Sequence, residues 1–426
     1  MKQVTRPQET VSVLQLRLHN TVVAYLAGYA GGRNILTFAP AFISDPERPT
    51  FTLTTHPDFP HSDALLSTAW IKQQRLHPVL SNLLPEGALR EWLAQTLKIH
   101  QDNEFPLFVH LGQDLPGAIV AEPVAPADVP AYAFEGRDSV TAVPVAGDES
   151  STRFSLAGVQ MKFSMRQEDG RYHMTGAGEL GNWIIKTPST RHPFVPRNEF
   201  SAMTLAELAG VEIPPVKLVE LQNLNNLPAI NLPQERHAFA IQRFDRVGQE
   251  RIHMEDFAQV FVEYADQKYG KVNYEQMAKV LYQYSGKALQ NAQQFARRLL
   301  VNILLANGEA HIKNWSLIYA DGVTPELSPA YDILSTRVYM GDEKHFALNL
   351  GKTKAWYEVD FDRFQAWARA ADIPWRAIKP HLDDTLDKAR TLWPQALREL
   401  PMVDPHKREL RNHWSSLQAA FRIDTV

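Results

Sequence analysis

The chain has 426 residues, of which 44% are hydrophobic and 22% charged, and its formal net charge is −4. This is the composition of an ordinary globular protein with room for two or three domains, without the basic excess that would coat nucleic acid through bulk charge. The absence of cysteine excludes disulfides, thiolate catalysis, Fe–S clusters and cysteine-ligated zinc. We expect a cytoplasmic protein with no membrane partner, because the polar N-terminus also lacks the apolar run of a signal peptide.

Residues 1–125 are predicted to form a small β-rich N-terminal subdomain. Residues 11–45 alternate apolar and polar positions, which predicts a small antiparallel β unit. Residues 62–98 have apolar positions at helical spacing, and residues 118–124 are predicted to form one more strand. Residues 126–152 are rich in Pro, Ala, Asp and Gly, so we predict a linker there.

From residue 153 the pattern changes to short apolar stretches separated by turns. It predicts a β-rich lobe over 153–247, interrupted by a helix over 198–210 that ends on a glycine. Residues 248–426 are predicted to be mainly helical. The expected fold class is therefore α+β: a protein-kinase-like two-lobe fold with a small β-rich N-terminal subdomain and a mainly helical C-terminal lobe. Architecture alone would not establish a function.

The segments NGEAHIKNWSLIY and LSPAYDILST carry the candidate catalytic groups. Phosphoryl transfer needs a carboxylate beside the attacking hydroxyl and oxygen ligands for Mg²⁺ on the triphosphate. Protein kinases place this carboxylate and an Asn with four residues between them, which is the spacing of Glu309 and Asn314, and Asp332 follows where a second Mg²⁺ ligand is expected. Such a pair also arises by chance, Asp332 alone could cap a turn, and a lone His311 is more often structural than a ligand.

Upstream residues supply the other parts that a kinase needs. Lys186 ends the apolar strand WIIK, where a cation would meet the α- and β-phosphates, and Glu199 begins the next predicted helix, where it would hold that lysine. The segment FSLAGVQMKFS has Gly158 between two strand-like runs and offers Ser155 and Lys162 as phosphate contacts. This loop matches neither a GxGxxG nor a Walker A pattern.

The segment FAIQRFD is an apolar strand that leads into a polar turn, and Phe244 within it could stack on adenine. The parts thus follow one another as loop, lysine, glutamate, hinge, catalytic segment and metal aspartate. This is the order found in kinases, and the joint match is much harder to obtain by chance than any single part.

Several of these segments resemble the HipA family, the toxin kinases of HipBA toxin–antitoxin modules. The resemblance rests on SLAGVQMKFS, WIIKTPS, NEFSAMTLAELAG, IQRFDR, IHMEDFAQ, NGEAHIKNWSLIY and LSPAYDILSTRVY. The segment LSNLLPEGALREWL also looks like the small N-terminal subdomain of that family, so the resemblance extends over essentially the whole chain. It implies a bacterial cytosolic Ser/Thr kinase with a kinase-like fold that uses ATP and Mg²⁺.

The resemblance also implies a cellular role. HipA proteins phosphorylate an aminoacyl-tRNA synthetase, typically the glutamyl enzyme, which inhibits translation and promotes growth arrest and persistence. A HipB-like DNA-binding antitoxin would neutralise the toxin and bring it to operator DNA. Autophosphorylation at Ser155 would eject the phosphate loop and inactivate the kinase.

The resemblance assigns roles to individual positions. Glu309 takes the position of the catalytic base, Asn314 and Asp332 match the Mg²⁺ ligands, and His311 is kept as a further catalytic candidate. Lys186 matches the ATP lysine and counts as both catalytic and ATP-binding. The candidate ATP-binding residues are Ser155, Gly158, Val159, Gln160, Lys162, Lys186, Glu199, Gln242, Phe244 and Asp245.

Glu309 departs from the family, which has Asp at this position. The extra methylene adds roughly 1.5 Å of reach, and a misplacement of about 1 Å can cost on the order of 10²-fold in rate. Three interpretations follow: an active toxin kinase, a pseudokinase that acts as corepressor with a DNA-binding antitoxin, or a small-molecule kinase on the same scaffold. Residues 255–275 are expected to border the acceptor site without identifying the acceptor.

Overall fold

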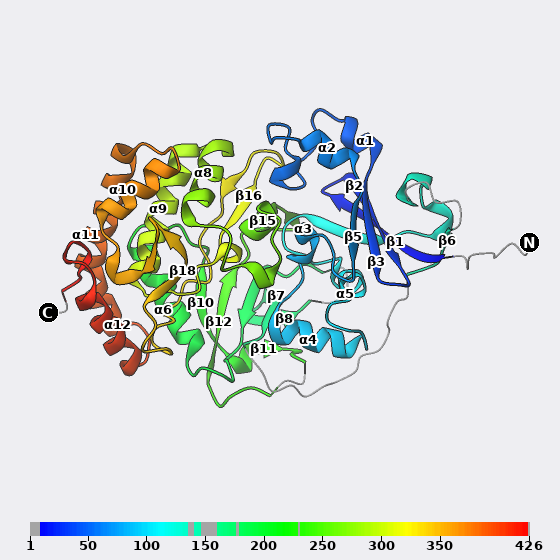
Figure 1. Cartoon of the computed structure of the whole chain (residues 1–426). Helices are drawn as coiled ribbons and strands as arrows, with labels where there is room; N and C mark the ends of the chain where they lie inside the picture. The colour runs from blue at the N-terminus through cyan, green and yellow to red at the C-terminus, as the bar shows by residue number, and fades with distance from the viewer. Residues whose placement is uncertain (1–8, 135–139, 146–159, 176–178, 229–230, 425–426) are drawn as a thin grey trace, which may run out of the picture.

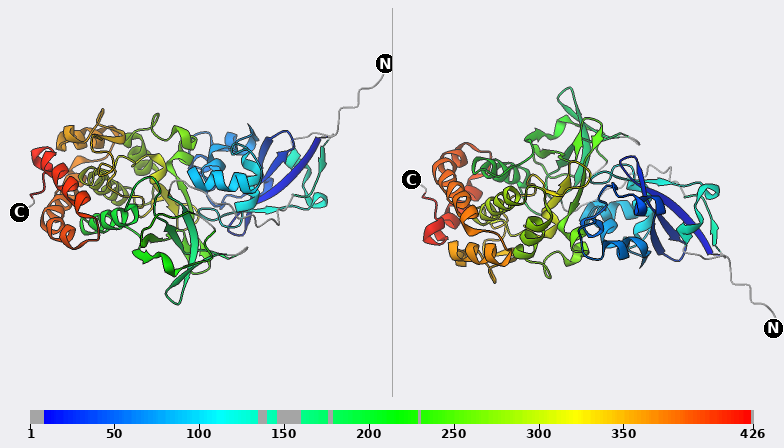
Figure 2. Two further views of the ribbon diagram at one scale, coloured as in Figure 1. Left: turned by 90° about the horizontal axis from the view of Figure 1, so that it is seen from below. Right: turned by 90° about the horizontal axis from the view of Figure 1, so that it is seen from above.

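The computed structural model describes residues 9–134, 140–145, 160–175, 179–228 and 231–424. Figure 1 shows an elongated molecule, with the N-terminal domain at one end, a second β-sheet in the middle and a helical lobe at the other end. The two views in Figure 2 show the same succession. Within the described ranges, no helix is long and apolar enough to cross a membrane.

The N-terminal domain is built on one twisted sheet in the order β4-β3-β2-β1-β5, with β6 added beside β1. Neighbouring strands are antiparallel except for the parallel pair β1–β6. The antiparallel β unit predicted for residues 11–45 is confirmed up to residue 38, and alternate side chains of its strands pack into two cores on the two faces of the sheet, whereas residues 40–44 form a helix. The strands are β1 (Glu9–Leu18), β2 (Thr21–Tyr29), β3 (Arg33–Phe38), β4 (Trp70–Gln73), β5 (Ile119–Pro123) and β6 (Val140–Ala142).

Two expectations for this domain differ from the structure. The helix predicted over 62–98 is broken into three helices and a strand, because Trp70–Gln73 pairs with β3 and prolines interrupt the helical pattern. The predicted linker over 126–152 contributes β6 to the first sheet. The helices of this domain are α1 (Pro40–Ser44), α2 (Ser62–Ser67), α3 (Pro78–Ser81), α4 (Gly87–Thr96) and α5 (Glu104–Leu111).

The second sheet forms the β-rich lobe that was expected. Its order is β10-β12-β9-β7-β8-β11, and α6 (Val195–Leu208) packs against β10 and β12. The helix α6 begins after Phe194, whose φ is 61°, and it is followed by Gly210 with φ 88°, as the stop signal predicted. The strands are β7 (Lys162–Glu168), β8 (Arg171–Met174), β9 (Trp183–Lys186), β10 (Val216–Glu220), β11 (Leu224–Asn225) and β12 (His237–Gln242).

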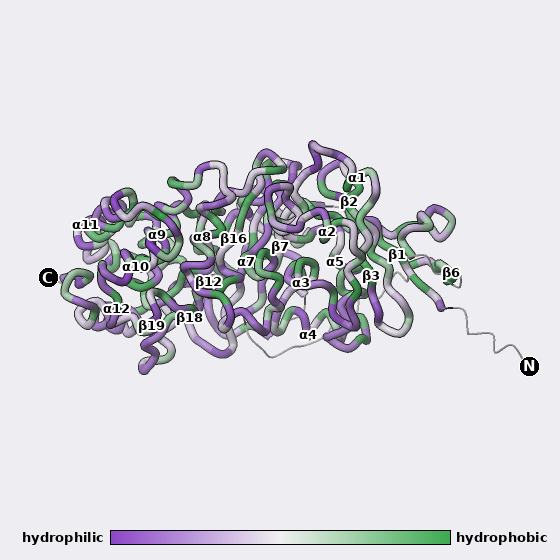
Figure 3. The backbone as a smooth tube through the Cα atoms, turned by 45° about the horizontal axis from the view of Figure 1, so that its top comes forward, coloured by the Kyte–Doolittle hydropathy of each residue, from purple (hydrophilic) through white to green (hydrophobic). Residues whose placement is uncertain are grey.

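The C-terminal lobe is mainly helical, as predicted, and is centred on α9. In its core Phe295 stacks on Trp315 and on Trp367, with ring centroids 4.3 and 5.8 Å apart. Figure 3 shows polar and apolar stretches alternating along its outer helices, which bury one face. The helices are α7 (Phe257–Val260), α8 (Tyr274–Tyr284), α9 (Ala288–Leu304), α10 (Phe361–Ala370), α11 (Trp375–Glu399) and α12 (Asp404–Ser416).

Short strands in this lobe carry the catalytic segments. The pair β15–β16 is antiparallel and continues into β17, so that the loop before β16 and the segment after β17 lie beside each other. The strands of this part are β13 (Arg246–Val247), β14 (Glu250–Arg251), β15 (His253–Asp256), β16 (Ser316–Tyr319), β17 (Glu326–Leu327), β18 (His345–Leu350) and β19 (Thr353–Ala355).

Candidate active site

Lys186 is the centre of the candidate site. It ends β9 and is 4% exposed, and its ammonium forms ion pairs with both Glu199 and Asp332. Burial alone would lower the pKa of Lys186, but the charges of Asp332 and Glu199 outweigh it and raise the pKa. The lysine is therefore a permanent buried cation, and the structure brings together three residues that were predicted from distant parts of the sequence.

Glu199 reaches this centre from the first half of α6, where it is 1% exposed. The neighbouring Asn198 fixes the helix to the segment that follows Asp332. Its side chain donates to the Ser335 carbonyl at 2.8 Å and accepts from the Ser335 amide at 3.1 Å. These two hydrogen bonds hold Glu199 and Asp332 in a fixed position relative to each other. Asn198 had not been predicted, since nothing in its sequence context distinguishes it from a solvated helix residue.

Asp332 has a left-handed backbone with φ 54°, which costs a non-glycine residue on the order of 1–2 kcal/mol. Its carboxylate contacts the ammonium groups of Lys186 and Lys162, the latter at 3.1 Å. Burial would raise the pKa of Asp332, but these two lysines hold it well below its usual range. The carboxylate is therefore ionised whenever the protein is folded at neutral pH, as a metal ligand must be.

The catalytic segment folds back on itself. The Asn314 side-chain amide donates to the Glu309 carbonyl at 2.8 Å, which leaves its Oδ1 atom as the acceptor that faces away from that bond. Arg298 of α9, which is 2% exposed, donates to the Asn314 carbonyl and stacks over Trp315 at 4.3 Å. Asn314 is thus fixed from both sides, and Arg298 is a buried support that the sequence pattern did not reveal.

The Glu309 side chain is 41% exposed and lies at the surface of this centre. The Tyr269 hydroxyl donates to its Oε2 atom at 2.5 Å, and His311 Nε2 lies 3.6 Å from the same atom. Burial and the Glu309 charge raise the pKa of Tyr269, so its hydroxyl stays a donor. Tyr269 was placed only in the broad acceptor region 255–275, and its contact with Glu309 was not foreseen.

His311 is 5% exposed and packs edge-on against the Tyr269 ring, with ring centroids 5.2 Å apart. Burial lowers the pKa of His311 to about 3, and the charge of Lys268 adds to the effect. The imidazole is therefore neutral at pH 7. In this state it supplies no positive charge to a phosphate.

The oxygen atoms of Asn314 and Asp332 fit Mg²⁺, a hard cation that binds one or two carboxylates and keeps several waters. Among the described residues, no group of three His, Cys, Asp or Glu side chains could hold a metal on its own. A two-ligand Mg²⁺ site that is completed by phosphate oxygens does not need such a group. In this structure the cations of Lys186 and Lys162 balance the Asp332 charge.

The predicted hinge residues divide into two groups. Gln242 ends β12, and its backbone N–H donates to the Pro215 carbonyl. Phe244 stacks on Tyr331, the residue before Asp332, with ring centroids 5.8 Å apart. Asp245 instead points away from this centre. It forms buried ion pairs with Arg243 and Arg246 and accepts from the Gly117 amide at 2.8 Å, so its carboxylate joins the second sheet to the N-terminal domain.

Of the predicted phosphate loop, Ser155, Gly158 and Val159 lie outside the described residues. Gln160 is the first described residue of this segment, and Lys162, at the start of β7, lies opposite Lys186 in the register of β7 and β9. Lys162 is 49% exposed apart from its contact with Asp332. The structure thus places one loop residue at the centre of the site.

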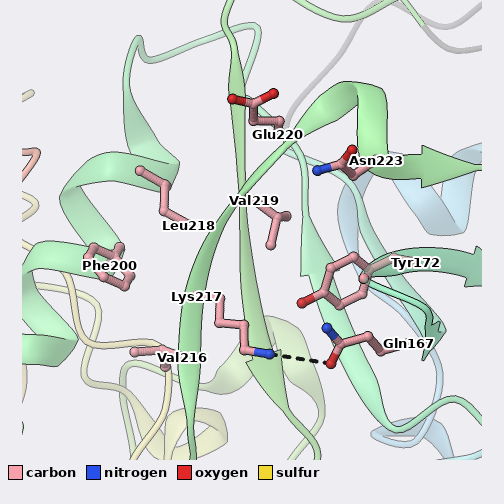
Figure 4. Close-up of a pocket in the computed structure, with 10 residues that line it drawn as sticks. Gln167, Tyr172, Phe200, Val216, Lys217, Leu218, Val219, Glu220 and Asn223 are labelled. Atoms are coloured by element: carbon pink, nitrogen blue, oxygen red, sulfur yellow. Dashed lines mark hydrogen bonds between the residues drawn. The ribbon is translucent and has the colours of Figure 1, made fainter.

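A separate pocket of about 590 Å³ lies on the second sheet, lined by residues of β8, β10 and neighbouring segments (Figure 4). Within it Lys217 donates to Gln167 at 3.3 Å. None of the candidate site residues lines this pocket, so it is distinct from the centre around Lys186.

Comparison with known proteins identifies the relatives of this arrangement. A family model described as the HipA-like C-terminal domain matches residues 154–393, and one described as the HipA N-terminal domain matches residues 14–122. The curated protein "Putative kinase Y4dM" of Sinorhizobium fredii is 38% identical over 396 residues, which cover 92% of this chain and 94% of the relative. The serine/threonine-protein kinase toxin HipA of Shewanella oneidensis is 24% identical over 362 residues, covering 76% and 77%.

A solved structure has the same fold. The complex of HipA, HipB and operator DNA from Shewanella oneidensis MR-1 contains a chain that superposes with a TM-score of 0.69 at 20% identity, over 96% of both chains. At this identity the likeness shows the fold alone. It confirms the predicted α+β architecture of a β-rich lobe and a helical lobe behind a small N-terminal domain.

Proposed function

Because this chain belongs to the HipA family, we propose that it is an ATP- and Mg²⁺-dependent Ser/Thr protein kinase. The observation that carries the proposal is the buried charge centre in which Lys186 contacts both Glu199 and Asp332. Burying several charges costs solvation free energy that packing alone would not require. Such a centre is expected where the charge of a triphosphate has to be held.

Each residue of the centre has a role in this proposal. Asn314 and Asp332 would hold Mg²⁺, which supplies charge neutralisation to the phosphates when it is bound. Lys186 would contact phosphate oxygens while Glu199 keeps its side chain in place. Glu309 would accept the proton of the attacking hydroxyl, a task for which its exposed carboxylate, held by Tyr269, is suitably placed.

The finer assignments come from the family. We propose that the acceptor is a hydroxyl of an aminoacyl-tRNA synthetase, probed first with the glutamyl enzyme, and that Ser155 is the autophosphorylation site. The related Shewanella structure is a complex of HipA with HipB and operator DNA. This supports a HipB-like antitoxin as the partner of this chain, with operator DNA reached mainly through the antitoxin.

The experiment is a phosphoproteomic comparison of cells that express the wild type and cells that express Asp332→Ala. Removing this carboxylate deletes a metal ligand, so we expect phosphorylation of one or a few proteins, with a synthetase among them, to disappear in the variant. A chain that leaves identical phosphoproteomes in the two strains, while binding ATP in purified form, would sink the proposal.

The alternative function is a HipA-like pseudokinase that acts as corepressor with a DNA-binding antitoxin. The observation that favours it is the glutamate at position 309, which is one methylene longer than the family's aspartate. If the proposed kinase is correct, Glu309→Gln lowers the transfer rate by about 10²–10⁴-fold, the usual contribution of a general base. A wild type without turnover that gains activity through Glu309→Asp would establish the alternative instead.

A further inference from the structure

A short segment of the N-terminal domain, residues 76–86, lies directly on the catalytic segment. Its helix α3 contacts α7, and the two are labelled next to each other in Figure 3. Two hydrogen bonds fix this contact: Gln259 donates to the Val79 carbonyl at 2.7 Å, and the Tyr264 hydroxyl donates to the Leu76 carbonyl at 3.0 Å. The N-terminal domain is therefore close enough to influence the groups that carry out the chemistry.

The contact converges on Lys313, the residue before Asn314. The Lys313 ammonium donates to Asn82 Oδ1 at 2.9 Å, to the Asn82 carbonyl at 3.2 Å and to Asp256 Oδ2 at 2.8 Å, with Glu86 at 3.6 Å. Its side chain is 10% exposed. Since an ammonium has three N–H donors, these three acceptors occupy it fully. Lys313 is thus held by the N-terminal domain and by β15, and it does not point to Asp332 as Lys162 and Lys186 do.

Asn82 is itself fixed by contacts on both sides of the domain boundary. Its Nδ2 donates to the Pro78 carbonyl within the N-terminal domain and to the Glu263 carbonyl of the C-terminal lobe, each at 2.8 Å. Asn82 is 7% exposed. With both amide hydrogens bonded, Oδ1 has one orientation, toward Lys313, and a buried amide in this state is costly to disturb.

The position of Lys313 is transmitted to both candidate metal ligands. Lys313 lies in the same short helical turn, Ile312–Asn314, as Asn314. Its backbone carbonyl accepts from the Tyr331 hydroxyl at 3.1 Å, and Tyr331 precedes Asp332. A displacement of this turn would therefore move Asn314 and the support of Asp332 together, and about 1 Å of displacement is enough to cost on the order of 10²-fold in rate.

We propose that Asn82 of the N-terminal domain is a positioning residue for phosphoryl transfer, and that it acts through Lys313 on the catalytic segment. The inference rests on the proposed kinase function and adds to it a site component that is remote in sequence. Through this contact the N-terminal domain influences the rate of transfer.

The test is single-turnover autophosphorylation of the full-length chain with Mg²⁺-ATP, measured as phosphate per chain over a range of ATP concentrations. We expect Asn82→Leu to lower the maximal rate by about 10- to 100-fold and to leave the ATP concentration for half-maximal rate within about two-fold. Asn82→Ser removes Oδ1 without adding an apolar branch, so it should lower the maximal rate by a smaller factor. It replaces Asn82→Leu in the test if that variant does not fold.

Two comparisons separate positioning from a general effect on domain docking. Thr50→Val removes a 2.7 Å hydrogen bond from the Thr50 hydroxyl to the Val323 carbonyl at the same domain boundary, but it touches no residue of the catalytic segment, and its maximal rate should match the wild type. In the Lys313→Met background, Asn82→Leu should have little further effect, because the two residues act through one contact.

The inference is overturned if folded Asn82→Leu or Asn82→Ser keeps the wild-type maximal rate, if Thr50→Val loses as much, or if the Asn82 and Lys313 effects simply add. A wild type that transfers no phosphate under any of these conditions would instead refute the proposed function, and the positioning role would fall with it. The two failures are therefore distinguishable.

Discussion

At the scale of single residues, the candidate site is a set of charges whose neighbours determine their state. Lys186 is buried and Asp332 is largely so; the lysine keeps its charge because of Asp332 and Glu199, and Asp332 keeps its charge because of Lys162 and Lys186. His311, in contrast, has charges of both signs around it and is held neutral mainly by burial. The sequence pattern identified the types and order of these residues. It could not show that His311 is neutral, since the pKa depends on neighbours that only the fold brings together.

Tyr269 is the residue on which the proposed action of Glu309 depends most directly. Its hydroxyl holds the flexible glutamate side chain in one place, which offsets the freedom of the extra methylene. A hydrogen bond to a charged group contributes about 1.5–3 kcal/mol, so Tyr269→Phe should lower the transfer rate by about 10- to 100-fold. Because Tyr269 is 41% exposed, the melting temperature should hardly change.

The measurement for Tyr269→Phe is the single-turnover rate of the purified variant beside its thermal unfolding curve. Tyr132→Phe, a tyrosine of similar exposure in the N-terminal domain, is a matched control. A Tyr269→Phe protein that is as fast as the wild type would show that Glu309 needs no such support.

At the scale of elements, the strands and helices that carry the site were predictable because their apolar periodicity is regular. The helix α6 had both an apolar pattern and a glycine stop signal, and it was placed to within a few residues. The region 62–98 failed because its apolar residues serve β4 and three short helices in turn. Apolar positions counted at helical spacing over the whole stretch do not separate these elements, because strand pairing and prolines set their boundaries.

The strand β15 carries a buried glutamate that makes the contact between the N-terminal domain and the C-terminal lobe sensitive to pH. Glu255 accepts from the Thr52 hydroxyl and the Leu53 amide, each at 2.7 Å, and from Tyr319, so it joins the N-terminal domain to the C-terminal lobe. Burial raises the pKa of Glu255 from 4.5 to about 7, although these hydrogen bonds oppose the shift. The folded state therefore holds a proton that the unfolded state has already lost above pH 4.5.

The stability that this proton provides is fully present below pH 4.5. It decreases as the pH rises and is lost above about pH 7. Across that window the wild type should lose about 3 kcal/mol of unfolding free energy relative to Glu255→Gln, which does not titrate. Urea denaturation of both proteins between pH 4.5 and 8 measures the difference. Parallel curves would show that Glu255 does not titrate in this range.

At the scale of the whole molecule, the N-terminal domain is joined to the kinase-like part by buried polar contacts. Asp114 forms ion pairs with Arg243 and Arg246 at 3.0 Å each, and Leu53 is buried within the core of the C-terminal lobe. Asp245 was predicted to bind ATP but belongs to this boundary. The sequence predicts that Asp245 follows the end of an apolar strand. It cannot predict that the Asp245 carboxylate contacts the N-terminal domain.

The order of parts along the chain was therefore predictable, whereas the contacts between domains were not. Lys186, Glu199, Asn314 and Asp332 could be predicted as site residues because kinase chemistry requires those residue types in that order. Asn82, Tyr269 and Arg298 act through contacts with residues that are distant in sequence. No single-chain pattern encodes such contacts, and the domain boundaries given at 125, 152 and 247 likewise remain predictions.

The most direct test of the account is transfer of the γ-phosphate by the purified chain. The wild type, Lys186→Met and Asp332→Ala would be incubated with Mg²⁺-ATP and labelled sites identified by mass spectrometry. We predict stoichiometric phosphate on the wild type, at Ser155, and at least a 10²-fold lower rate in both variants, of the order seen when a phosphate or charge contact is lost. A folded, ATP-binding wild type that acquires no phosphate, or variants that label as fast as it does, would contradict the claim that this charge centre is a kinase site.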